Sequence, residues 1–143
     1  WYRALFGASV QAGILEPADL AGYRNRPVYI RGSVHVPPPH EALMDCMETF
    51  FGLLENEESA AVRAVLGHFL FVFIHPYPDG NGRLGRFIMN LMLASGGYPW
   101  TVIRMAERDA YLSTLEQASA HQEIGPFAEF ITREMQVNWA RQE

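Results

Sequence analysis

The chain has 143 residues, of which 49% are hydrophobic and 19% are charged, and its formal net charge is -5. All 11 basic residues are arginines, which excludes sites that need lysine, such as a Walker-type phosphate site or a Schiff base. The single Cys46 excludes intrachain disulfides and cysteine-based zinc or iron–sulfur sites. We expect one domain over residues 1–143, cut from a longer protein, with a lead-in helix over 1–21 and a core over 22–143.

Nothing in the sequence indicates a membrane or a nucleic acid as partner. No apolar run approaches the roughly 20 residues that a membrane span needs, and no signal-peptide pattern opens the chain. The net negative charge of the chain and the lack of a basic helix face argue against nucleic-acid binding. We therefore expect a cytoplasmic location.

Helical periodicity dominates the chain. Ser59 is a suitable N-cap, and Pro76 ends the apolar stripe that follows it. Glycines at 96 and 97 make a good helix stop. The pattern predicts helices over these segments: 1–11, 40–54, 59–75, 81–96, 106–120 and 126–141.

One stretch before the proline run has strand character. It reads Val28-Tyr29-Ile30, Arg31-Gly32-Ser33 and Val34-His35-Val36. Two β-rich triplets around a glycine turn predict a small β-hairpin or flap. The expected fold is therefore mainly α, a helical bundle with one short β-hairpin flap.

Residues 75–86 form the most informative segment, His-Pro-Tyr-Pro-Asp-Gly-Asn-Gly-Arg-Leu-Gly-Arg. Gly80 and Gly82 flank Asn81 at the start of a predicted helix, where backbone N–H groups can turn inward to form an anion site. Arg83 and Arg86 are three residues apart, so both can fork onto phosphate oxygens. The segment predicts a phosphate-binding loop.

Two further side chains give this loop the means for chemistry. Asp79 is placed to hold a divalent metal shared with phosphates, and His75 can accept a proton near neutral pH. Taken singly, each feature has an ordinary structural explanation, such as a helix-end histidine or a turn dipeptide. Their combination in one loop favours an active site. His68 lies on the same helical face as His75, but two histidines without a third ligand make a poor metal site, so we expect His68 to be packed in the interior.

The loop also matches the dinucleotide-binding fingerprint literally, through Gly80, Gly82 and Gly85. That fingerprint places its first glycine directly after a strand, whereas five polar and proline residues intervene here. The preceding apolar run has helical period, and no second strand–helix unit follows. We reject the dinucleotide-binding interpretation.

The segment from His75 to Arg86 resembles the signature loop of Fic domains, His-x-Phe-x-(Asp/Glu)-Gly-Asn-Gly-Arg-x-x-Arg, with Tyr77 in place of phenylalanine. Residues 28–39, 108–111 and 127–130 are also similar to segments of that family. The resemblance implies a nucleotidyltransferase that moves AMP from ATP to a Ser, Thr or Tyr hydroxyl of a target protein and releases pyrophosphate.

The resemblance also implies a role for each residue of the site. His75 would be the base, Asp79 would hold Mg²⁺, and Gly80, Asn81 and Gly82 would cradle the α- and β-phosphates. Arg83 and Arg86 would neutralise the outer phosphates, and Tyr111 would lie near the nucleotide. The flap residues that would dock the target are Val28, Tyr29, Ile30, Arg31, Gly32 and Ser33.

Several alternatives stay open within this resemblance. The same fold can serve phosphoryl transfer, removal of AMP, or ATP sensing and peptide binding without turnover. Many Fic proteins carry an inhibitory helix whose glutamate pairs with the last loop arginine, here Arg86. The partial match at Ser119 and Glu123 is broken by Ile124, so that helix would lie upstream of Trp1, on another chain, or nowhere. A homodimer is also compatible with the resemblance.

Overall fold

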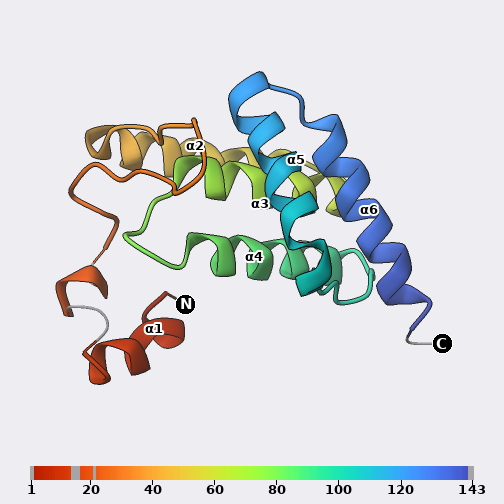
Figure 1. Cartoon of the computed structure of the whole chain (residues 1–143), viewed down its shortest axis with the longest axis horizontal. Helices are drawn as coiled ribbons and strands as arrows, with labels where there is room; N and C mark the ends of the chain where they lie inside the picture. The colour runs from red at the N-terminus through yellow and green to blue at the C-terminus, as the bar shows by residue number, and fades with distance from the viewer. Residues whose placement is uncertain (1, 14–16, 21, 142–143) are drawn as a thin grey trace.

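The computed structural model describes residues 2–13, 17–20 and 22–141, and this part of the chain forms six α-helices and no β-strand (Figure 1). The helices are α1 (Tyr2–Gln11), α2 (Leu43–Asn56), α3 (Ala60–Ile74), α4 (Asn81–Ser95), α5 (Arg108–His121) and α6 (Gly125–Trp139). Short 3₁₀ turns cover Pro17–Leu20, His40–Ala42 and Met105–Glu107. All six predicted helices are confirmed, although Trp1 lies outside the described residues. None of these helices is both long and apolar enough to cross a bilayer.

Local signals in the sequence set most of the helix ends. The hydroxyl of Ser59 accepts a hydrogen bond of 3.4 Å from the backbone N–H of Val62, which satisfies one of the free donors at the start of α3. Pro126 occupies the first turn of α6, where its missing N–H is not needed. The 3₁₀ turn from Met105 delays α5 by two residues relative to its predicted start.

Helices α3 and α4 form an antiparallel pair, and the loop 75–80 joins them at one end of the molecule (Figure 1). Gly85 lets the two helices approach closely, because a Cβ there would lie only 3.0 Å from Cγ1 of Val72. Residues of α1, α2, α3 and α4 bury one apolar cluster around Phe6, Phe50 and Phe71. Residues of α3, α4, α5 and α6 bury a second one around Met89 and Phe127. The α3–α4 pair therefore lies between both clusters and provides a rigid support for its own connecting loop.

The predicted β-hairpin over residues 28–36 is not observed. The segment makes a single turn in which the backbone N–H of Ser33 donates to the carbonyl of Ile30 at 3.2 Å. Its next donors go to side chains: the N–H of Val34 donates to Glu116 on α5 at 2.8 Å, and the N–H of His35 donates to the Ser33 hydroxyl at 3.0 Å. Because these donors bond to side chains, one of them on α5, the β-branched residues gain no strand partner among the described residues. We keep the name flap for residues 28–36.

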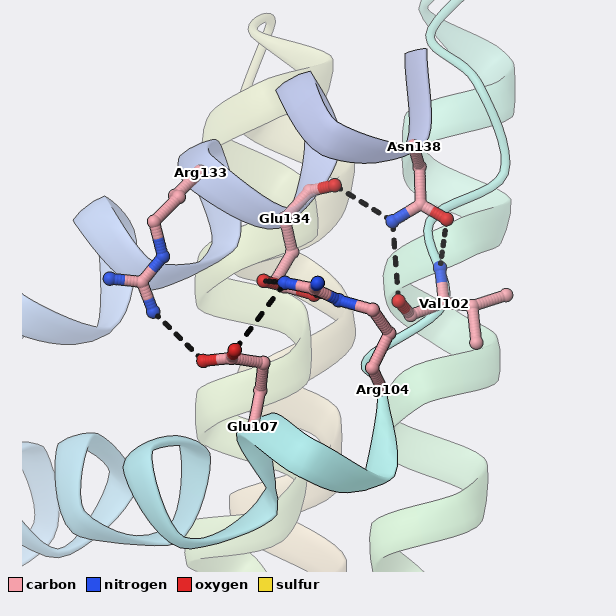
Figure 2. Close-up of polar contacts among 6 residues, drawn as sticks. All are labelled: Val102, Arg104, Glu107, Arg133, Glu134 and Asn138. Carbon is pink, nitrogen blue, oxygen red and sulfur yellow. Dashed lines mark hydrogen bonds and ion pairs between the residues drawn. The ribbon is translucent and has the colours of Figure 1, made fainter. Parts of the chain in front are cut away.

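Two asparagine side chains hold the segment that connects α4 to α5. The amide of Asn90 on α4 accepts from the N–H of Thr101 at 2.6 Å and donates to its carbonyl at 3.0 Å. The amide of Asn138 on α6 does the same for Val102, with both distances 3.2 Å (Figure 2). Side-chain amides thus satisfy consecutive backbone groups that a neighbouring strand would otherwise pair.

A charged cluster continues this attachment toward α5 (Figure 2). The carboxylate of Glu134 is fully buried and accepts two hydrogen bonds from the Arg104 guanidinium, at 2.8 and 3.2 Å. Arg104 also lies 3.5 Å from Glu107, which in turn lies 3.5 Å from Arg133. The two-fold contact compensates the burial of the Glu134 charge and fixes α6 against the segment that leads into α5.

Candidate active site

His75 ends α3 in an unusual backbone conformation. Its φ of 53° and ψ of 57° lie in the left-handed region, which residues other than glycine and asparagine rarely adopt. Its N–H still donates to the carbonyl of Phe71 at 3.0 Å, which closes the last helical turn. The surroundings must therefore hold this conformation.

Arg24 supplies much of that support from the segment before the flap. Its Nε donates to the carbonyl of His75 at 2.8 Å, and one Nη donates to the carbonyl of Ile74 at 3.4 Å. Its own backbone N–H donates to the carbonyl of Pro76 at 2.8 Å. Arg24 is buried, and burial lowers the pKa of its guanidinium. A positive charge at the C-terminus of α3 also complements the helix dipole.

The imidazole of His75 is oriented and kept neutral. Its Nδ1 lies 3.1 Å from the carbonyl oxygen of Val72, and since a carbonyl can only accept, Nδ1 carries the proton of the neutral ring. Burial lowers the pKa of His75 below its ordinary value, and the positive charge of Arg24 adds to this, while the Val72 carbonyl and Asp79 oppose it. The Nε2 lone pair is therefore free to take a proton at neutral pH.

The turn after His75 is built around two aromatic rings. Tyr77, the residue at which the loop departs from the Fic pattern, stacks on Tyr2 of α1 with ring centroids 3.8 Å apart. The buried side chain of Asn81 accepts from the N–H of Tyr77 at 3.0 Å and donates to its carbonyl at 2.8 Å. The Asn81 amide thus shapes the loop from inside.

Gly80 and Gly82 stand at the first turn of α4. Gly80 has φ of 82°, and a Cβ there would overlap the ring of Phe6, so only glycine fits this position. At Gly82 a Cβ would lie 3.6 Å from an Nη of Arg86, so a small side chain would fit but would narrow the approach to the helix end. The anion site at the backbone N–H groups of this turn stays a prediction, which the helix start at Asn81 fits.

The two loop arginines point to different neighbours. The side chain of Arg83 lies 3.5 Å from Asp79 and covers the ring of Phe6 at 4.5 Å. Arg86 lies on the other side, with its guanidinium carbon 6.0 Å from the ring centroid of Tyr111. Both arginines line a shallow hollow of about 200 Å³ between the side of α4 and the segment from Trp100 to Ile103. A polyphosphate could therefore meet both guanidinium groups.

Asp79 is the one predicted metal ligand, and its side chain is exposed. Among the described residues, no three His, Cys, Asp or Glu side chains gather into a metal site. A single exposed carboxylate nevertheless fits Mg²⁺, because this ion commonly binds through one or two carboxylates together with substrate phosphates and water.

A cavity of about 210 Å³, which we call the flap cavity, joins the flap to the loop and to α5. The predicted site residues that line it are Ile30, Arg31, Gly32, Ser33, His75, Gly82, Arg86 and Tyr111. The remaining predicted residues, which do not line it, are Val28, Tyr29, Asp79, Gly80, Asn81 and Arg83. The structure thus brings His75, the predicted base, Arg86, a predicted phosphate ligand, and the flap turn to one cavity.

Glu116 on α5 fastens the flap over this cavity. Its carboxylate accepts hydrogen bonds from the Ser33 hydroxyl at 2.5 Å and from the N–H of Val34 at 2.8 Å. The Ser33 bond is the main cause of a pKa for Glu116 below the ordinary value, and the Val34 bond acts in the same direction. Tyr29, by contrast, is 80% exposed and free to meet a partner molecule.

Three contributors to the site escaped the sequence analysis: Arg24, His68 and Glu116. Their partners are 43 or more residues away or are backbone carbonyls, so no spacing pattern marks them. Tyr111, which was predicted near the nucleotide, lines the flap cavity, but its ring is buried and its hydroxyl lies 2.8 Å from Nε2 of His68.

Comparison with known proteins agrees with this geometry. The model of the Fic/DOC family matches residues 2–93. A protein named protein adenylyltransferase Fic from Nematostella vectensis is 37% identical over 125 residues, which is 85% of this chain and 29% of that protein. The protein of the same name from Drosophila virilis is 37% identical over 123 residues, covering 83% of this chain and 25% of that protein. The chain therefore spans only about a quarter of the curated relatives that it matches.

Solved structures show the same fold. Fic-1 from C. elegans superposes with a TM-score of 0.82 at 25% identity, over 98% of this chain and 40% of that one. A Fic family protein from Desulfovibrio desulfuricans superposes with a TM-score of 0.77 at 25% identity, over 99% of this chain and 46% of that one.

Proposed function

Because this chain belongs to the Fic/DOC family, we propose that it is a protein adenylyltransferase that transfers AMP from ATP to a hydroxyl of a target protein. The observation that carries this proposal is the His75 ring, whose Nδ1 lies 3.1 Å from the Val72 carbonyl and which lines a cavity shared with Gly82 and Arg86. A base beside an anion site suits the transfer of a phosphorus group to a hydroxyl.

In the proposed reaction, Nε2 of His75 takes the proton from a Ser, Thr or Tyr hydroxyl of the target. The hydroxyl oxygen forms a bond to the α-phosphorus of ATP, and the bond from that phosphorus to the α–β bridging oxygen breaks. Pyrophosphate leaves with the electron pair of the broken bond. His75 needs no prior deprotonation at neutral pH, since its surroundings lower its pKa.

The loop would supply positioning and charge neutralisation, which dominate such transfers. We assign the α- and β-phosphates to the backbone amides of Gly80, Asn81 and Gly82, because the Asn81 side chain is already bonded to Tyr77. Arg83 and Arg86 would meet the outer phosphates. Asp79 would hold Mg²⁺, which neutralises phosphate charge when bound.

The target would dock beside the flap turn. Ile30, Arg31, Gly32 and Ser33 line the flap cavity, and Tyr29 is exposed next to them. The flap has no strand partner among the described residues, so an extended target segment could pair with its backbone. Glu123, in the partial match to the inhibitory motif, lies exposed beyond the end of α5, so any inhibitory helix would lie upstream of Trp1 or on another chain.

Labelled ATP tests the reaction. The chain is incubated with a lysate of target proteins and ATP labelled at the α- or the γ-phosphate, beside a His75→Ala variant. A His121→Ala variant is the matched control, because that histidine is exposed at the end of α5. We expect α-label on protein with the parent chain and with His121→Ala, and at least a 100-fold loss with His75→Ala, as is usual for a general base.

The other outcomes separate the alternatives. If protein is labelled only from γ-labelled ATP, the reaction is phosphoryl transfer and not AMP transfer. If protein that already carries labelled AMP loses its label, the reaction is AMP removal. If the chain binds ATP but transfers no label, the result would indicate a nucleotide-sensing module without turnover. Equal labelling by the His75→Ala variant would show that His75 is not the base.

A further inference from the structure

A chain of three side chains leads from the core of the molecule to the flap cavity. His68 on α3 is fully buried, with its ring packed against Phe127 at a centroid distance of 5.3 Å. Its Nε2 lies 2.8 Å from the hydroxyl oxygen of Tyr111 on α5. The guanidinium carbon of Arg86, the loop arginine that lines the flap cavity, lies 6.0 Å from the centroid of the same Tyr111 ring.

The proton positions along this chain follow from the chemistry of its members. A guanidinium can only donate, and that of Arg86 lies beside Tyr111, so the side of the Tyr111 hydroxyl that can face Arg86 is its oxygen. In that orientation the single hydroxyl proton of Tyr111 points at His68, whose Nε2 accepts it. The proton of the neutral ring is then on Nδ1 of His68, an atom that is buried and has no hydrogen-bond partner among the described residues.

The environment of His68 keeps it an acceptor. Burial lowers the pKa of His68 to about 3, and the nearby charge of Arg86 contributes in the same direction. The imidazole therefore stays neutral at any pH at which the enzyme works. An apolar residue would fill the same space without leaving a buried ring nitrogen unpaired, so packing alone does not account for a histidine at this position.

We infer that His68 is a positioning residue, which orients the Tyr111 hydroxyl so that its oxygen holds the Arg86 guanidinium toward the phosphates of the nucleotide. This inference rests on the proposed function, in which Arg86 meets the outer phosphates of ATP. His68 itself touches no substrate. Its effect should therefore appear only with nucleotides that carry those phosphates.

Calorimetric titration of ATP and of AMP tests this role in four variants. His68→Leu and Tyr111→Phe each remove the bond between the two residues, whereas His68→Gln offers a neutral acceptor near the position of Nε2. Phe69→Leu is the control for a packing change on α3. We expect about fivefold weaker ATP binding for His68→Leu and Tyr111→Phe, the equivalent of one ordinary hydrogen bond, with AMP binding unchanged. His68→Gln should recover most of the ATP affinity, and Phe69→Leu should leave the ratio of the two affinities unchanged.

A double variant and a nuclear magnetic resonance measurement make the test stricter. Combining His68→Leu with Tyr111→Phe should weaken ATP binding no further than either change alone, because both break the same chain. Nitrogen shifts of labelled histidine should show Nε2 of His68 without a proton, a result that does not depend on any nucleotide.

The failures are distinguishable. If the parent chain binds no ATP, the proposed function fails and the role of His68 fails with it. If the parent binds ATP and Arg86→Ala loses that affinity while His68→Leu retains it, only the role of His68 is overturned. Equal weakening of ATP and AMP by His68→Leu, or a proton on Nε2, would also overturn it in favour of simple packing.

Discussion

The guanidinium of Arg24 donates a hydrogen bond of 2.8 Å to the carbonyl of His75, the residue that ends α3 and is the proposed base. Its further bonds reach the carbonyls of Arg26, Pro38 and Ile74. One buried arginine thus joins the segment before the flap, the proline run after it and the end of α3. It fixes the backbone on both sides of the flap relative to His75.

Replacing Arg24 with glutamine should therefore impair both stability and catalysis. The carbonyls that lose their donor are part-buried, so we expect a loss of about 1–3 kcal/mol in the free energy of unfolding. Misplacement of His75 should lower kcat about 10- to 100-fold. Arg141→Gln, which removes an exposed positive charge after α6, is the control. Denaturant unfolding and labelling rates measure the two effects, and a stable variant with unchanged kcat would contradict the positioning of His75 by Arg24.

The surroundings of His75 also predict the pH dependence of the reaction. The base must be unprotonated, so activity is present above the pKa of His75 and is lost as the pH falls through it. Because burial and Arg24 lower that pKa, the acid limb should have its midpoint below 6.5, the ordinary value for histidine. Initial labelling rates between pH 5 and 8 give this midpoint. A midpoint above 6.5 would mean that the ring is more solvated than the structure indicates.

The helices could be predicted from the sequence because their ends depend on local signals. Ser59 caps α3 as expected, and α4 begins at Asn81, directly after the glycine with positive φ. The residues of the loop were equally visible in the sequence, because they lie within a dozen positions, and their chemical roles stay a prediction. The residues that hold the loop in place, Tyr2, Phe6 and Arg24, are distant in the sequence and were not predicted.

The conformation of the flap and the contact between His68 and Tyr111 depend on residues distant in the sequence, so they could not be predicted from it. The triplets around Arg31 have strand character, but a strand forms only beside another strand, and the donors of the flap go instead to Glu116, 82 and 83 residues further on. His68 was expected to be packed, and it is, but nothing in its spacing indicated Tyr111, 43 residues away. Such pairings are created by the packing of α5 on α3.

Gly80 should tolerate no side chain. Replacing it with alanine forces a Cβ into the ring of Phe6 and strains a backbone at φ of 82°. We expect a loss of about 1–3 kcal/mol from the strain alone, together with weaker ATP binding as the loop shifts. Gly82→Ala is the matched variant, since its Cβ has room and its stability should change little. Thermal unfolding compares the two, and equal stability would show that α1 does not hold the loop as described.

His68 should make the protein sensitive to acid. Its folded pKa of about 3 lies below the ordinary 6.5, so unfolding takes up a proton below pH 6.5 and stability falls as the pH decreases. The unfolding constant should rise roughly tenfold per pH unit between 6 and 4 from this group alone. Tyr111 and Arg86 face the ring. In urea titrations at several pH values, His68→Gln should reduce the dependence of the unfolding constant on pH by that amount. An unchanged pH dependence would show that the His68 ring is not buried.

The cluster around Glu134 should behave as a buried ion pair rather than as a set of surface contacts (Figure 2). Arg104→Met removes the guanidinium that donates two hydrogen bonds to the fully buried carboxylate of Glu134. We expect the variant to be strongly destabilised, because the carboxylate is left buried and unpaired. Glu107→Gln removes only partly exposed contacts at 3.5 Å, so its effect should be several-fold smaller.

The decisive variant combines Arg104→Met with Glu134→Leu. Since an apolar pair leaves no charge buried alone, the double variant should be more stable than Arg104→Met, even though it carries one more substitution. Arg104 also lines a hollow of about 310 Å³ with Arg86 and Tyr111, so the recovered variant can be tested for ATP affinity as well. Urea midpoints of these variants and of Glu134→Leu alone settle the order, and additive losses would mean that Glu134 and Arg104 contribute independently of each other.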